Sequence, residues 1–451
     1  MIAAAPGRLA ERPDPRRPGQ RPPTLMEVVL FSAAVLALFA FSGAWVAPFE
    51  NSGGPSGESP ILRAVNYPAY AAGALIALAC FPDVWRTLLR SPLLIVALLV
   101  AAASVTWSID GAQTMRRVIA LWMSTFVAVA IASRWDWDRL AEVLAVLFAV
   151  CAAIVLVTAL LLPGTGRMMD IFPGAWRGLW PEKNAMGGNM ALGFAAFCAA
   201  AAMVPQRRWL WTGMAVVALF LVVMSTSKTS LLCCGLALGC VVFVALVRRG
   251  PLTSVATVLT AVVGAAAVAA VALFASEFVF QALGKDSTLT GRTDIWEPAM
   301  RQARERPLTG FGYGAVWNDE SGWGPVAWIT RQAGFRAFHA HNSWIAIWLE
   351  TGLLGLGAVA LLFVETVILA LIAPFRTRGA YLALPFLAAY GLMTVSETVV
   401  FTFNDLRWCL FVIVSCKLAA PHLPRAAAAW HAVRPRAWTE PVFRRPYSTL
   451  A

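Results

Sequence analysis

The feature that most constrains the fold of this chain is a succession of long apolar runs. About twelve of them recur between residues 26 and 420, most near the roughly 20 residues that a helix needs to cross a bilayer. In lipid the backbone must satisfy its own hydrogen bonds, so such runs are helices. The sequence is 59% hydrophobic and only 13% charged, far less charged than a soluble domain. We therefore predict an all-α polytopic membrane protein with about 12 transmembrane helices. The runs are 26–47, 64–82, 92–106, 116–133, 140–162, 185–204, 209–226, 229–247, 252–275, 343–373, 380–397 and 405–420.

Arginines in the short connections predict the orientation. With twelve spans, five basic connections and both basic tails fall on one side, which the positive-inside rule makes cytoplasmic. The net charge of +12 is thus an orientation signal and an attraction to anionic lipid. It is spread over many short loops, and we predict no nucleic-acid partner. The arginines are Arg86, Arg90, Arg134, Arg139, Arg207, Arg208, Arg248, Arg249, Arg376 and Arg378.

These patterns predict a simple domain order. Residues 1–25, rich in Arg and Pro, form a disordered cytoplasmic tail, and residues 26–275 hold transmembrane helices 1–9. A large periplasmic loop follows at 276–342, then helices 10–12 at 343–420 and a second cytoplasmic tail at 421–451.

The stretch HNSWIAIWLETGLLG, from residue 341 to residue 355, is the strongest candidate for chemistry. His341 and Asn342 end the polar loop just before an apolar helix, whose unpaired N–H groups and positive dipole end favour phosphate. The apolar run is longer than a simple span, which predicts a bend near Gly352. Taken alone, His341 is more often an interfacial histidine that has no chemical role.

Cations gather on the predicted outer side. Lys228 lies in the turn STSKTS, Arg292 in GRTDIW and Lys183 in PEKN, while Arg116 and Arg117 begin a span. Arginine can grip phosphate oxygens with two hydrogen bonds and lysine acts as a point charge. Snorkelling to lipid headgroups is the alternative for each. Together with a histidine base and no apparent metal cage, the set suits a departing diphosphate. No metal or cofactor is predicted.

The spacing His341–Asn342, nine residues, Gly352, two residues, Gly355 resembles the signature of the O-antigen ligase and polymerase superfamily. The segments GRTDIWEPAMRQARERPLTGFGYG, PEKNAMGG and STSKTSLL are similar to that superfamily's corresponding segments. The resemblance runs from about residue 116 to residue 408. Lys-Asn at 183–184 with Ser-Lys-Thr at 227–229 looks more like the exopolysaccharide-polymerase branch.

The resemblance implies a metal-independent glycosyltransferase of the bacterial inner membrane, with a GT-C-like helical fold and a periplasmic active site. Its substrates would be undecaprenyl-diphosphate-linked glycans, as donor and as acceptor. The superfamily's essential histidine falls on His341, its loop arginine on Arg292 and its second arginine on Lys228. Lysine at that last position departs from the ligase pattern and favours a polymerase. His341 could be a general base or an imidazolium that contacts diphosphate. Further candidates for substrate or diphosphate binding are Arg116, Arg117, Lys183 and Asn342.

Two other functions fit parts of the sequence. A ligase that transfers the glycan to a lipid or protein acceptor shares the same motifs. A lipid-linked oligosaccharide transporter shares the number of spans, but transporters favour repeated halves with a site at the bilayer midplane. Membrane lipid is an expected partner, and a chain-length regulator is a possible one.

Overall fold

The computed structural model describes residues 23–52, 61, 64–169, 172–274, 292–319 and 321–420. Nearly all of the two predicted tails, and residues 276–291 of the predicted large loop, lie outside these ranges. Within them every regular element is a helix, and the one β contact is an isolated bridge between Arg167 and Trp176. The prediction of an all-α membrane protein is confirmed.

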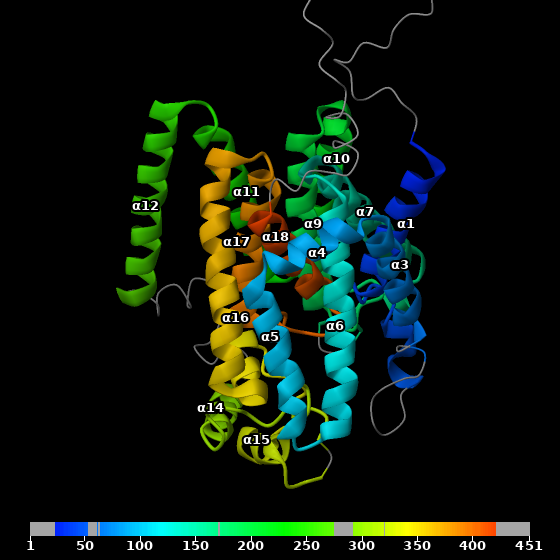
Figure 1. Cartoon of the computed structure of the whole chain (residues 1–451), viewed down its shortest axis with the longest axis vertical. Coiled ribbons are helices and arrows are strands. Elements are labelled where there is room, and N and C mark those ends of the chain that lie inside the picture. Colours follow the sequence, from blue (N-terminus) through cyan, green and yellow to red (C-terminus); the bar gives the residue numbers. More distant parts are fainter. Residues whose placement is uncertain are drawn as a thin grey trace, which may run out of the picture.

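Each predicted apolar run corresponds to one helix of the bundle in Figure 1. Among the described residues, six helices, α6, α7, α9, α10, α11 and α16, are long and apolar enough to cross a membrane, and α3 with α4, bent by 97°, could add a seventh span. Twelve spans thus stay a prediction. The bundle consists of α1 (Leu25–Ala40), α3 (Asn66–Ala79), α4 (Phe81–Leu89), α5 (Pro92–Ala103), α6 (Gly111–Arg134), α7 (Trp137–Leu161), α9 (Lys183–Met203), α10 (Arg208–Met224), α11 (Lys228–Val247), α12 (Pro251–Phe274), α16 (Ser343–Arg376), α17 (Ala380–Ser396) and α18 (Leu406–Ala419).

The basic connections meet at one end of the bundle. Arg248 in the α11–α12 connection donates to the carbonyls of Pro374 and Thr377 at the end of α16, at 3.0 and 3.2 Å. Arg378 in turn donates to Ala202 and Met203 at the end of α9. Figure 1 shows these connections at the top, and α14 (Arg292–Ala303) and α15 (Pro325–Ala333) at the bottom. The arginines therefore share one end, as the sequence predicts; which side of the membrane they face stays a prediction.

Helix α16 is broken at Gly352, which confirms the predicted bend. Gly352 has φ 66° and ψ −166°, a conformation that is essentially restricted to glycine. The break leaves backbone groups of the helix available, and the preceding loop pairs with them. The N–H of Leu353 donates to Pro307 at 2.8 Å, and the N–H of Gly312 donates to the carbonyl of Glu350 at 2.8 Å. The sequence GFGYG at 310–314 is thus a loop that lies against a broken helix.

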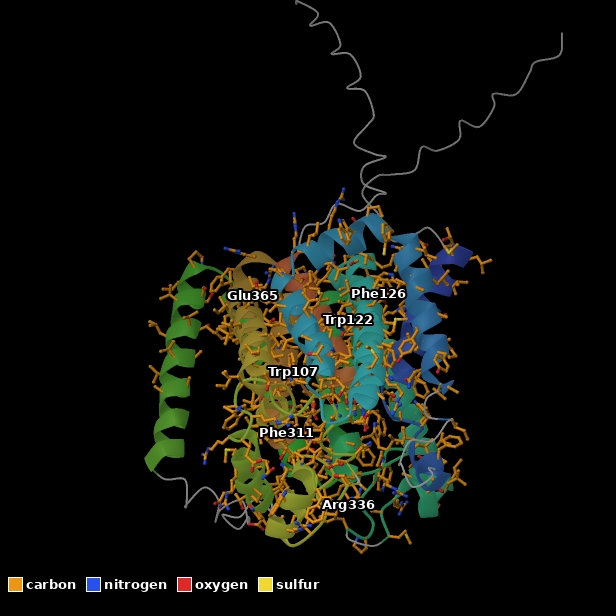
Figure 2. The ribbon with its side chains drawn as sticks, turned by 60° about the horizontal axis from the view of Figure 1, so that its bottom comes forward. Trp107, Trp122, Phe126, Phe311, Arg336 and Glu365 are labelled. Atoms are coloured by element: carbon orange, nitrogen blue, oxygen red, sulfur yellow. The ribbon has the colours of Figure 1, made fainter. Side chains whose placement is uncertain are left out.

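The described part of the predicted large loop has a small apolar core of its own. Ile295 and Ala299 of α14 pack with Ile329 of α15, and Ala346 and Leu349 in the first turns of α16 complete the cluster. The connection between α5 and α6 holds this unit from the side, since the Trp107 indole N–H donates to Thr309 at 2.8 Å. Figure 2 labels Trp107 and Phe311 in this region. The start of α16 is therefore fixed by both the bundle and the loop.

Candidate active site

The loops that converge at the end opposite the basic connections carry backbone strain. Among the described residues, four that are not glycine have left-handed backbone: Thr226, His341, Phe401 and Asn404, with φ between 50° and 60°. Each costs on the order of 1–3 kcal/mol, and such strain gathers at functional sites. All four stand in connections: α10–α11, the approach to α16, and α17–α18. This end of the bundle is the candidate active site.

His341 and Arg292 share one carboxylate. Nδ1 of His341 lies 3.3 Å from Oε2 of Glu397, and Nη2 of Arg292 lies 2.9 Å from Oε1 of the same side chain. All three side chains are partly buried. Glu397 thus joins the two residues that the motif singles out, although it stands 56 positions beyond His341.

Burial alone would raise the pKa of Glu397. The hydrogen bond with His341 and the positive charges of Arg292 and Arg407 act against burial, and together they hold the pKa of Glu397 below its ordinary value. The carboxylate is therefore charged at neutral pH. A carboxylate beside an imidazole fixes the ring's orientation and stabilises its protonated form.

Ser343 and Trp296 hold this arrangement in place. The buried Ser343 hydroxyl donates to the Glu397 carbonyl at 2.9 Å and accepts from the N–H of Val399 at 2.9 Å. The Trp296 indole of α14 donates to the carbonyl of Ala340, next to His341, at 2.9 Å. The start of α16, the α17–α18 connection and α14 are therefore cross-linked around the histidine.

A cavity of about 280 Å³, which we call the cationic cavity, lies beside this cluster. Among the described residues, four cations line it, Lys183, Lys228, Arg292 and Arg407, against the one carboxylate of Glu397. The first turn of α11 also lines it, and the side chain of its N-cap residue, Ser227, makes no capping hydrogen bond. Fixed cations and free helix N–H groups are what a phosphate group requires.

The two lysines come from turns that pack on each other. Nζ of Lys183 donates to the Thr226 hydroxyl at 2.9 Å. Gly187 allows this contact, because a Cβ there would lie 2.6 Å from the Ser225 hydroxyl oxygen. The predicted residues Lys183 and Lys228 are thus brought together with Arg292.

Asn342 caps the N-terminus of α16, the helix that it precedes. Its Oδ1 accepts from the N–H groups of Trp344 and Ile345, at 3.0 and 3.3 Å, as a cap of α16. These are N–H groups that we expected to face phosphate, and the helices whose first residues line the cationic cavity are α9, α11 and α14 instead. A role for Asn342 in diphosphate binding stays a prediction.

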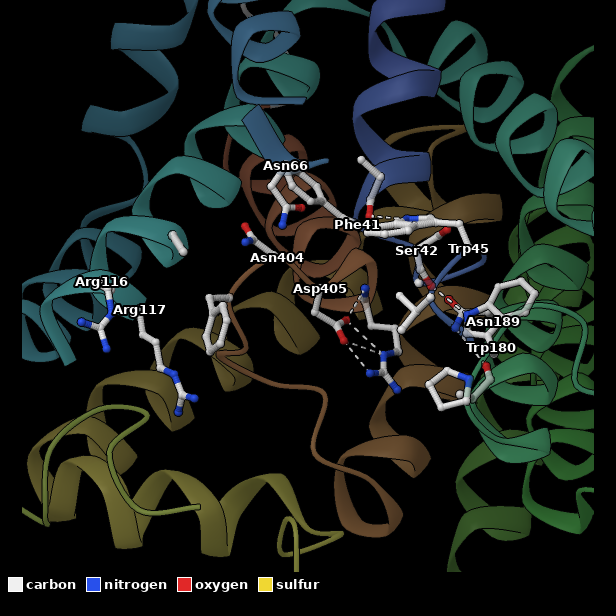
Figure 3. A pocket seen from close by; sticks show the side chains of 18 of the residues that line it. Phe41, Ser42, Trp45, Asn66, Arg116, Arg117, Trp180, Asn189, Asn404 and Asp405 are labelled. Carbon is white, nitrogen blue, oxygen red and sulfur yellow. Dashed lines mark hydrogen bonds and ion pairs between the residues drawn. The ribbon is translucent and has the colours of Figure 1, made fainter. Parts of the chain in front are cut away.

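Arg116 and Arg117 lie in a different cavity, of about 540 Å³, which we call the larger cavity (Figure 3). Arg116 is exposed, whereas Arg117 is buried, donates to the carbonyl of Gly314 and lies 5.3 Å from the Phe403 ring. Arg407 lines both cavities. The structure therefore divides the predicted residues into two groups that meet at Arg407.

Three charged residues of this end were missed in the sequence: Glu397, Asp405 and Arg407. Arg407 is ion-paired with Asp405, whose carboxylate also caps α18 through the N–H of Arg407 at 2.7 Å. They are the only charged residues between Gly379 and Cys416. Ionisable residues within an apolar stretch are functional candidates by default, so this pattern could have identified them.

The buried imidazole of His339 predicts that the folded protein is less stable in acid. Burial, reinforced by the charge of His341, lowers the pKa of His339 to about 4, from an ordinary 6.5. Between pH 6.5 and about 4, His339 is therefore protonated in the unfolded chain but neutral in the folded chain. The free energy of unfolding falls as the pH falls through this window, by up to about 1.4 kcal/mol per pH unit. Replacing His339 with Phe, which keeps a ring against His341, should flatten this dependence. Thermal unfolding of the purified protein from pH 7.5 to 4.5 measures it; equal slopes in the two proteins would contradict the expectation.

Comparison with known proteins finds a family match for the central part of the chain. Residues 213–360, which include Lys228, Arg292 and His341, match the O-antigen ligase family. This match confirms the resemblance to the O-antigen ligase and polymerase superfamily. The long apolar helices are consistent with an integral membrane protein.

The chain is also similar to the exopolysaccharide production protein ExoQ of Rhizobium meliloti. The two are 36% identical over 215 residues, which cover 46% of this chain and 49% of the relative. The chain thus spans about half the length of the curated relative that it matches. This match supports the exopolysaccharide branch of the superfamily.

Proposed function

We propose that this protein is a glycan polymerase of the bacterial inner membrane. It joins undecaprenyl-diphosphate-linked repeat units on the periplasmic side, without a metal ion, and releases undecaprenyl diphosphate. The observation that carries the proposal is the His341–Glu397–Arg292 cluster at the edge of a cavity with four cations. The similarity to an exopolysaccharide production protein supports a polymerase over other activities.

His341 is the proposed general base. When Nδ1 carries the proton toward Glu397, Nε2 is the acceptor and can take the proton of a sugar hydroxyl. The hydroxyl oxygen forms a bond to the anomeric carbon of the donor glycan as the bond from that carbon to the diphosphate oxygen breaks. Glu397 stabilises the imidazolium that results. Of the two roles open for His341, this carboxylate favours the base over a direct diphosphate contact.

The cationic cavity is the proposed diphosphate site. The leaving diphosphate gains negative charge as the glycosidic bond forms, and Lys183, Lys228 and Arg292 lie where they can stabilise it. Arg292 uses Nη2 for Glu397, so it also links the diphosphate to the base. The N–H groups at the start of α11 add a further set of donors.

Glu397 is a positioning residue in this mechanism. Replacing it with Gln keeps the size and an acceptor for Arg292 but removes the charge. We expect kcat to fall by about 10²-fold, within the range of general-base contributions. KM for the lipid-linked glycan should change little, because the cations that line the cavity stay in place. A purely structural role would raise KM as kcat falls, so a matching rise in KM counts against the assignment.

The test of the function uses purified protein in lipid nanodiscs with EDTA and the lipid-linked oligosaccharide of the host. A ladder of repeat units on a gel establishes a metal-independent polymerase. The match to the O-antigen ligase family favours a ligase as second candidate. Transfer of a single glycan to an added lipid acceptor, with no ladder, would replace the polymerase by the ligase. Glycan movement across the membrane without any new glycosidic bond would replace both by a transporter.

A further inference from the structure

The larger cavity is built almost entirely by parts of the chain that the family comparison does not reach. Of the described residues that line it, only Asn318 lies within residues 213–360. The others come from the end of α1, the starts of α3, α6 and α9, and the α17–α18 connection with the start of α18. The cationic cavity, in contrast, takes Arg292 and the turn at 226–230 from the matched region. The two cavities therefore have different origins in the sequence.

The lining of the larger cavity is rich in side-chain amides and aromatic rings. Four asparagines line it: Asn66, Asn189, Asn318 and Asn404. An amide both donates and accepts, as a sugar hydroxyl does. Figure 3 shows Trp45, Trp180 and Asn189 on one side of the cavity and Arg116 and Arg117 on the other. A flat ring with a polar edge next to amides is a surface suited to a sugar ring.

Asn189 places a buried amide in the lining of this cavity. Its side chain is 3% exposed, and its Nδ2 donates to the carbonyl of Ala185 at 2.9 Å. Its Oδ1 is buried and has no hydrogen-bond partner among the described residues. A buried acceptor without a partner costs on the order of 1–3 kcal/mol.

Most cations of the larger cavity already have partners, so this cavity is less suited to phosphate than the cationic cavity is. Arg407 is neutralised by Asp405, and Arg117 is held by the Gly314 carbonyl and the Phe403 ring. Arg116 is the exposed cation of the lining. The volume of about 540 Å³ falls within the usual range of small-molecule sites and is nearly twice that of the cationic cavity.

We propose that the larger cavity binds sugar residues of the acceptor glycan, and that the side chain of Arg407 separates this glycan from the donor diphosphate. The inference rests on the proposed function and assigns a ligand class to a second site. A glycan held there ends at Arg407, which also borders the cavity lined by Glu397. Its terminal hydroxyl is then presented to the His341–Glu397 pair. Specificity for the repeat unit resides in the asparagines and in Trp45.

The test is a direct binding measurement that needs no glycosyl transfer. The probe is the soluble repeat-unit oligosaccharide, released by mild acid from the lipid-linked pool of the host, and the readout is saturation-transfer NMR with the protein in nanodiscs. Trp45→Ala and Asn189→Leu should each weaken binding by about tenfold, as expected for one lost stacking or hydrogen-bonding contact. Trp45 is only partly buried, so its variant is the one expected to fold without difficulty.

Two control variants make the result specific. Trp209→Ala removes a tryptophan that is 84% exposed at the other end of the bundle, and Lys228→Ala alters only the cationic cavity. Both should bind the oligosaccharide as the wild type does, and inorganic pyrophosphate should not displace it. Absence of binding by the wild type, unchanged binding by both cavity variants, loss of binding in Lys228→Ala, or displacement by pyrophosphate would each overturn the assignment. Binding without a ladder in the transfer assay would instead leave the glycan site standing and remove the polymerase.

Discussion

Replacing His341 with Asn is expected to lower glycosyl transfer by about 10²–10⁴-fold, the range that a general base contributes. Asparagine is chosen because His341 has φ 50°, a left-handed backbone that asparagine tolerates better than most residues. The variant should fold normally, since the loop core and the Ser343 contacts do not involve the imidazole. The measurement is the rate of ladder formation, with monodispersity and thermal unfolding as folding checks.

His339→Phe is the matched control for this variant. The ring centroids of His339 and His341 are 3.9 Å apart. Among the described residues, Nδ1 of His339 has no hydrogen-bond partner, so this ring is not hydrogen-bonded to Glu397 through that atom. Most of the activity should survive its replacement at neutral pH. Polymer of normal length and rate from the His341 variant would remove the proposed base from the mechanism.

Replacing Gly352 with Ala is expected to prevent the folding of the active-site end. A Cβ at this position would overlap the backbone carbonyl group of Leu308, and alanine would also have to adopt φ 66° with ψ −166°. Strain of this kind costs on the order of 1–3 kcal/mol before the overlap is counted. Relief would require the 307–314 loop to leave α16, with loss of the Leu353–Pro307 hydrogen bond. We expect a strong fall in the yield of monodisperse protein and no transfer.

Gly357→Ala tests the same substitution in the same helix without the overlap. No atom lies within 4 Å of a Cβ built at Gly357, so this variant should be at least as stable as the wild type. Comparison of the two by size-exclusion chromatography and thermal unfolding isolates the effect of the break. Equal behaviour of the two variants would mean that the loop can move away from α16 at little cost.

The sequence predicts those parts of the site that depend on local pattern. The bend at Gly352 follows from a run that is too long for one span, and Lys183, Lys228 and Arg292 follow from their short polar turns. The partners of Glu397 could not be predicted, because they are remote in the sequence: Glu397 meets His341 and Arg292 over 56 and 105 positions. No local pattern contains such a pair.

The separation of Arg116 and Arg117 from the other cations has the same physical origin. All the cations lie near the same end of the bundle, so charge and orientation place them together. Only the packing of α6 against the loop at 313–314 assigns them to another cavity. Likewise, the length of α16 and its motif place Asn342 at a helix start, but the direction of its side chain toward its own backbone depends on the fold.

The position of Glu397 in the sequence means that the candidate site is assembled late in the synthesis of the chain. His341 and Arg292 are already present once α16 has been made, but the carboxylate that joins them stands between α17 and α18, and Arg407 lies in α18 itself. A nascent chain that has inserted only as far as α16 has the histidine and the loop arginine without their common anion. On the proposed function, the site is therefore complete only after the last two helices have packed against α16, and a chain that ends at α16 should catalyse no transfer.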